Sequence, residues 1–196
     1  MTSSPYADSR NEYGITPANN RNEFTKNESL SPIENDIQIL IQHKSWSAAG
    51  QRLMMTPTDA NLNLKVITRG GFISSAEFTP LHYACERRPP KEFIQKLIRI
   101  RPDAVKKRTM PGGALPLHIS CTWHAKQETV NILLATDPNG CKISDELGNL
   151  PLHSACFSGT SVEVISALLK SYPKAVLVRN SHGSLPEDIT LRLKVR

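Results

Sequence analysis

Apolar residues recur at helical spacing in three stretches of the chain between residues 93 and 169. In each part, apolar side chains recur three or four residues apart, which places them on one face of a helix. Each stretch therefore predicts a helix that buries one face against the rest of the protein. The apolar positions are Phe93, Ile94, Leu97 and Ile98, then Val130, Leu133 and Leu134, then Val164, Ile165, Leu168 and Leu169.

A shared heptapeptide precedes each predicted helix. It reads TPLHYAC at 79–85, LPLHISC at 115–121 and LPLHSAC at 150–156, and LPEDITL at 185–191 begins in the same way. The prolines Pro80, Pro116 and Pro151 lie 36 and 35 residues apart. Proline fits the first turn of a helix because its missing N–H would be unpaired there. Each unit therefore predicts a short helix, a tight turn and the longer amphipathic helix, which a second proline ends before an extended segment such as 175–176.

These units resemble the ankyrin repeat family. The resemblance rests on the heptapeptide, on the apolar pairs and on Glu92, Glu128 and Glu163, each twelve residues after its proline. It covers residues 78–191, with a period of 35–36 residues where the family has 33. The resemblance implies an all-α solenoid of stacked helix-turn-helix units joined by β-hairpin loops. It also implies that the histidine of each heptapeptide hydrogen-bonds the turn backbone and ties neighbouring repeats together.

The chain divides into three predicted regions. Residues 1–30 hold few apolar side chains and predict a disordered tail. Residues 31–77 combine a degenerate helix pair over 31–57 with a lengthened β-hairpin around Gly70-Gly71, where about ten residues are inserted. Full repeats are expected over 78–113, 114–148 and 149–183, and a partial capping repeat over 184–196.

The pair His82-x-x-Cys85 and its two counterparts repeat a spacing that brings two metal ligands onto one helix face. Neighbouring pairs sit one repeat apart, and packed helices lie about 8–10 Å from each other. That distance is too long for a disulfide, or for four ligands on one zinc ion. We therefore expect no metal site and no cofactor. The cysteines are interpreted as core residues: Cys85, Cys121, Cys156 and, at the repeat position of Val105 and Val176, Cys141.

The formal net charge is +6, and residues 82–110, with nine basic and three acidic side chains, account for all of it. This cluster fits either a solvated face or a docking surface for an acidic peptide. Trp123 stands at a turn between helices, where it is either a binding anchor or, as we favour, folds back onto the neighbouring repeat. The candidate partner-binding residues are Arg69, Phe72, Arg87, Arg88, Lys106, Lys107, Arg108, Trp123 and His124. The candidate structural residues are Pro80, Pro116, Pro151, His82, His118 and His153.

Composition and motifs narrow the function classes. No apolar run approaches the roughly 20 residues of a transmembrane helix, and the first residues lack the pattern of a secretory signal. Four cysteines are too few for a disulfide scaffold, so we expect a cytoplasmic or nuclear monomer. The sequence contains no nucleophile elbow, zinc-protease motif or P-loop, and we assign no catalytic residue.

The family resemblance implies a non-catalytic module that binds a partner protein through its hairpin tips and its concave helix face. We expect no nucleic-acid partner, although binding through the basic first repeat stays open as an alternative. A second alternative is a regulatory or targeting segment of a larger enzyme or channel. Because one fold serves many functions, the sequence does not identify the partner.

Overall fold

The structure is a computed structural model that describes residues 32–67 and 73–189. Within these residues, the proline of each heptapeptide is the first residue of a short helix, and a longer helix follows after a turn. Thr79, Leu115 and Leu150, which precede these prolines, have the extended backbone that proline favours in its predecessor. The pairs are α3 (Pro80–Arg87) with α4 (Lys91–Ile100), α5 (Pro116–Thr122) with α6 (Gln127–Thr136), and α7 (Pro151–Ser158) with α8 (Val162–Ser171).

A further pair, α1 (Pro32–Gln42) and α2 (Trp46–Met55), lies where the sequence predicts a degenerate helix pair. Leu53 of α2 is fully buried. The ring of Trp46 packs against the ring of Phe93 in α4, with 5.1 Å between the ring centroids. This contact joins the first pair to the second, so all four pairs belong to one stack.

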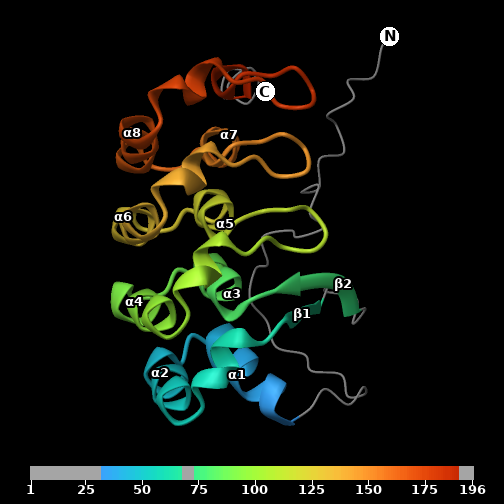
Figure 1. The fold of residues 1–196 in the computed structure, drawn as a ribbon, viewed down its shortest axis with the longest axis vertical. Coiled ribbons are helices and arrows are strands. Elements are labelled where there is room, and N and C mark those ends of the chain that lie inside the picture. The colour runs from blue at the N-terminus through green and yellow to red at the C-terminus, as the bar shows by residue number, and fades with distance from the viewer. Residues whose placement is uncertain (1–31, 68–72, 190–196) are drawn as a thin grey trace.

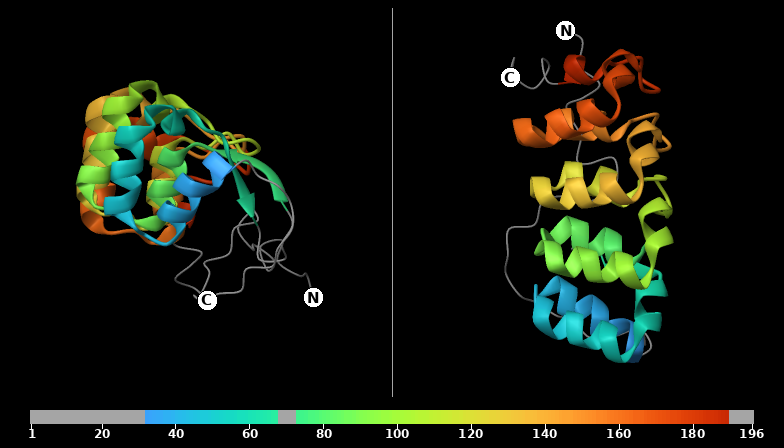
Figure 2. Two further views of the ribbon diagram at one scale, coloured as in Figure 1. Left: turned by 90° about the horizontal axis from the view of Figure 1, so that it is seen from below. Right: turned by 60° about the vertical axis from the view of Figure 1, so that its left-hand side comes forward.

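The helices of the stack form two rows. The inner row consists of α1, α3, α5 and α7, and the outer row consists of α2, α4, α6 and α8 (Figure 1). Figure 2 shows the two rows side by side, with the connecting loops projecting beyond the inner row. One core of buried apolar side chains runs along the stack. The predicted all-α solenoid is confirmed.

The recurring apolar positions of the outer-row helices contribute much of this core. Leu97, Leu133 and Leu168 share one repeat position, and each side chain is at most 2% exposed. Ile165 is only partly buried, whereas Ile94 and Val130 at the same repeat position are fully buried. Ile98 and Leu169, which share another position, are both partly buried. The burial therefore follows the sequence pattern most closely at the shared leucine position.

The prediction of an extended segment at 175–176 is wrong, because each proline that ends an outer-row helix also begins a short 3₁₀ helix. The fixed φ angle of proline suits the first residue of such a tight turn. The turn buries Ala175, but Val176 is 42% exposed and does not share the buried position of Val105 and Cys141. The four turns are η1 (Pro57–Asn61), η2 (Pro102–Lys106), η3 (Pro138–Lys142) and η4 (Pro173–Leu177).

Strands β1 (Leu64–Ile67) and β2 (Ile73–Phe78) form an antiparallel hairpin between η1 and α3, where the sequence predicts one. Leu64 pairs with Phe78, both side chains are buried, and the pairing is irregular between Lys65 and Ile67. The predicted turn at Gly70-Gly71, the candidate residues Arg69 and Phe72, the tail over 1–30 and the end of the capping repeat over 190–196 lie outside the described residues.

Substitution of two glycines with positive φ can distinguish the cost of backbone strain from the cost of steric overlap. Gly159 has φ +63°, and a Cβ added there would meet nothing within 4 Å, whereas at Gly148, with φ +75°, it would lie 2.8 Å from the Ser181 nitrogen. Gly159→Ala should lower the free energy of unfolding by about 1 kcal/mol, from strain alone. Gly148→Ala should lower it by about 2–4 kcal/mol, because the neighbouring loop must also shift. Urea unfolding followed by circular dichroism checks both values, and equal losses would contradict the packing of the two loops.

Candidate functional site

Three buried histidines link each repeat to the next. In the middle repeat, the backbone N–H of Leu115 donates to Nδ1 of His118 over 3.1 Å, and Nε2 of His118 lies 3.0 Å from the carbonyl oxygen of Asn149 in the following loop. Each ring therefore fixes the start of its own helix and holds the loop of the next repeat. The other two make the same pair of bonds: His82 with Thr79 and Ala114, and His153 with Leu150 and Ser184.

The hydrogen-bond partners define the protonation of these rings. Because Nδ1 accepts a backbone N–H, it carries no proton, so the neutral ring is protonated at Nε2 and donates to the carbonyl. Burial lowers the pKa of His82 and of His118 from 6.5 to about 4, since the charged ring would lose its hydration. Burial also lowers the pKa of His153. These three histidines, which we call the histidine relay, are thus neutral near pH 7.

The His-x-x-Cys pairs are not arranged as metal ligands. Both ring nitrogens of His82 are occupied by hydrogen bonds, and burial raises the pKa of the neighbouring Cys85 thiol to about 12. Burial raises the pKa of Cys121 as well, and a protonated thiol is a poor metal ligand. Within residues 32–67 and 73–189, no group of three or more His, Cys, Asp or Glu side chains is placed to hold a metal ion.

The fourth heptapeptide replaces the histidine with Asp188. Its Oδ2 accepts the backbone N–H of Leu185 over 2.8 Å, which is the bond that Nδ1 makes in the other repeats. An ionised carboxyl group has no hydrogen to donate. Asp188 therefore preserves the helix start but cannot donate to a further loop, and the relay stops at this residue.

The basic candidates at 106–108 lie at the end of η2, which Lys106 closes, and at the start of the loop that precedes α5. Lys106 and Lys107 are exposed, and Lys107 is within 3.8 Å of Asp103. Arg108 instead donates from Nη1 to the carbonyl oxygens of Gly113, over 3.0 Å, and of Ser144 in the next loop, over 2.9 Å. Arg108 thus has a structural role in joining two loops, and the two lysines are the side chains available to a partner.

The other candidates lie at the turns between inner-row and outer-row helices. Arg87 is within 3.5 Å of Glu86 and lies over the ring of Tyr83, so it is engaged within its own repeat. Arg88 is exposed, and its Nε donates over 2.8 Å to the carbonyl oxygen of Trp123 in the next repeat. Trp123 is partly buried and packs on the core, whereas His124 is exposed.

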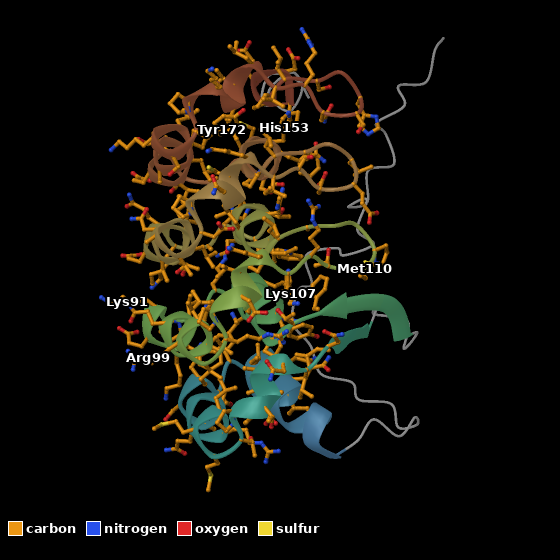
Figure 3. All side chains as sticks on the ribbon, viewed as in Figure 1. Lys91, Arg99, Lys107, Met110, His153 and Tyr172 are labelled. Carbon is orange, nitrogen blue, oxygen red and sulfur yellow. The ribbon has the colours of Figure 1, made fainter. Side chains whose placement is uncertain are left out.

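The candidate residues therefore occupy two separate edges of the stack. The loop with Lys106 and Lys107 leads into the start of α5, and Trp123 and His124 follow the end of the same helix. Seven helical residues separate the two edges by about 10 Å along the axis. The basic cluster of the sequence does not form one patch, because Lys91 and Arg99 lie on α4, far from Met110 on the loop side (Figure 3).

Sequence reasoning missed Lys44, which belongs with the second edge. Lys44, Arg88 and His124 follow the inner-row helices of three successive pairs with φ values of 56°, 57° and 54°. Gly159 holds the equivalent place in the fourth pair with φ 63°. The sequence did contain a signal for the conformation of Arg88 and His124, because these two residues and Gly159 each stand eight residues after a motif proline. A glycine in register with two basic residues indicates a left-handed turn that those residues must also adopt.

The neutral histidine relay makes stability depend on pH. Since the folded pKa of His82 and His118 lies below the unfolded value of 6.5, stability is retained above pH 6.5 and falls between pH 6.5 and about 4. Protonation of His82 and of His118 should each remove about 1.4 kcal/mol per pH unit in that window. Urea unfolding at several pH values measures this slope. His118→Gln should be less stable but show a shallower slope, and the exposed control His124→Gln should keep the slope; an unchanged slope in His118→Gln would contradict the relay.

The described part of the chain contains no helix that is long and apolar enough to cross a membrane. A comparison with models of known protein families matches residues 81–180 to ankyrin repeats, in three copies. No curated protein matches the chain. Ankyrin repeats are generally protein–protein interaction modules and are typically non-catalytic. The match covers just over half of the sequence and coincides with the stacked pairs from α3 to η4, so the chain belongs to the ankyrin repeat family.

Proposed function

We propose that this protein is a non-catalytic recognition module that binds an acidic segment of a partner protein. The partner would contact the loop side of the stack, at Lys106 and Lys107, and the adjoining face of the inner-row helices. The observation that supports this proposal most is a rigid loop that presents two exposed lysines. The motif histidines are occupied within the stack, so recognition falls to side chains on its edges.

The loop over 107–114 is held by several bonds. Thr109 donates its N–H to the carbonyl of Ala114 over 2.8 Å and accepts the N–H of Ala114 at its hydroxyl oxygen over 3.0 Å. Arg108 ties the same loop to its neighbour. Met110 is 58% exposed on this loop, so it adds an apolar contact beside the two lysines. A preorganised loop loses little conformational entropy when a partner binds, which favours affinity.

The distribution of charge supports a peptide rather than a nucleic acid as the partner. Several cations of the basic repeat are engaged within the protein: Arg101 pairs with Asp103, and Lys96 donates to the carbonyl of Gly50. Other cations lie away from the loop side that carries Lys107, as Lys91 and Arg99 do on α4 (Figure 3). Nucleic acids are bound by a continuous basic surface that follows the phosphate backbone.

The buried thiols of Cys85 and Cys121 agree with a reducing compartment, and we propose the cytoplasm or nucleus.

Reversing the charge of the two exposed lysines, Lys106 and Lys107, tests the proposed surface. Lys106→Glu with Lys107→Glu should reduce capture of an acidic partner from native cell extract about tenfold, because exposed charges act on encounter and partner choice. The free energy of unfolding, measured by thermal melting, should stay within about 0.5 kcal/mol of the value for the unaltered protein, since both side chains are exposed. Raising the salt concentration should weaken the unaltered complex as well.

The matched control is Lys170→Glu with Lys174→Glu, which makes the same charge change at exposed residues of the last repeat. It should retain the partner. Arg108→Glu serves as the structural comparison, because it should lower the free energy of unfolding by about 1–3 kcal/mol through two lost bonds. Equal capture by the two double variants would contradict the proposed surface.

A further inference from the structure

The turns between the two rows of helices contain a non-glycine residue with positive φ in three successive pairs. We call the turns over 43–45, 88–90 and 123–126 the turn edge. Lys44, Arg88 and His124 adopt a left-handed backbone in these turns, where the fourth pair has Gly159. Residues with a Cβ are strained in this conformation, and such strain clusters at functional sites. All three side chains can carry positive charge, and all three are exposed.

The turn edge is continuous from one repeat to the next. The helices α1, α3 and α5 pack in order, so the turns that follow them are neighbours. Arg88 reaches across one such step, since its Nε donates to the carbonyl oxygen of Trp123 over 2.8 Å. This bond fixes the guanidinium between two turns. Its two Nη groups have no hydrogen-bond partner among the described residues, so they are available to an anion.

Two lysines extend the positive charge in positions that helix electrostatics disfavours. Lys91 is the first residue of α4 and Lys126 precedes the first residue of α6, where the helix dipole opposes a cation. The equivalent residues of α8 are Val162 and Ser161, which are uncharged. Both lysines are exposed. Both lysines therefore add positive charge beside the turn edge without stabilising their own helices.

A shallow hollow of about 240 Å³ lies between the second and third turns. Pro89, Pro90, Lys91, Glu92, Lys126, Glu128 and Thr129 line it. Pro90 is exposed beside the hollow, whereas the exposed carboxylates of Glu92 and Glu128 would repel an acidic side chain inside it. A partner would therefore place uncharged residues there and carry its carboxylates at the turns on either side.

The spacing of the turns sets the spacing of those carboxylates. Neighbouring packed helices lie about 8–10 Å apart. An extended polyproline II segment rises about 3.1 Å per residue and brings every third residue to the same face, about 9.3 Å further along. We propose that the turn edge binds an extended acidic segment with a carboxylate at every third residue, facing Lys44, Arg88 and the pair His124 and Lys126. This surface is separate from the loop side of the proposed function.

Two fluorescent peptides of equal composition and charge test the spacing. The spaced probe is Glu-Pro-Pro-Glu-Pro-Pro-Glu, and the clustered probe is Glu-Glu-Glu-Pro-Pro-Pro-Pro. Fluorescence anisotropy at low ionic strength should show about tenfold tighter binding of the spaced probe, because the clustered probe cannot reach all three turns. Equal affinity for the two probes, or no binding of the spaced probe, would overturn the proposal.

Glycine variants remove each side chain while suiting the left-handed backbone. Lys44→Gly, Arg88→Gly and His124→Gly should each fold and should each weaken binding of the spaced probe about three- to fivefold. Lys106→Glu with Lys107→Glu should keep the affinity for this probe, so failure here and failure of the loop surface give different results. Unchanged affinity in all three glycine variants, or tighter binding of a short single-stranded oligonucleotide of the same charge, would overturn the proposal.

Discussion

The stack depends on one interaction, the hydrogen bond from a buried neutral histidine to the loop of the next repeat. The ring of His118 illustrates it, with Nδ1 accepting the N–H of Leu115 and Nε2 donating to Asn149. The first bond caps a helix that begins with proline, and the second bond reaches a loop carbonyl that also accepts an N–H from its own loop, as Asn149 does from Asp145. A single side chain therefore couples the local geometry of one repeat to the position of the following repeat.

Because the histidines are hydrogen-bonded inside the stack, the surface left for a partner consists of other side chains. The residues that define the repeat are buried within it, so they are unavailable to a partner. The side chains that differ between repeats lie on the loops and the inter-helix turns, and the helix pairs hold them in fixed positions. Lys107 and Met110 on one edge, and Arg88 on the other, are presented in this way. The repeat thus supplies a rigid frame on which these edge side chains are held.

The sequence predicts the fold well because the heptapeptide fixes both the helix start and the period. It predicts the edges less well, for two physical reasons. Arg108 reads as a surface charge, but its bonds to Gly113 and Ser144 arise only when two loops stack. Lys44 reads as an ordinary helix-end residue, because its repeat lacks the motif that would place it in register with Gly159. Contacts between repeats and backbone strain depend on stacking, which residue types alone do not encode.

The histidine relay also gives the stack a polarity. Every Nε2–H points toward the next repeat along the chain, so the two faces of each repeat differ in what they leave unpaired when a neighbour is removed. Loss of the following repeat leaves the ring N–H without its carbonyl partner, whereas loss of the preceding repeat leaves a carbonyl oxygen that still accepts an N–H from its own loop, as Asn149 does from Asp145. An aspartate at the histidine position, as in Asp188, removes that donor while keeping the helix cap. Repeats of this chain are therefore not interchangeable blocks: one with histidine holds both its own helix start and the following loop, and one with aspartate keeps only the bond to its own helix start.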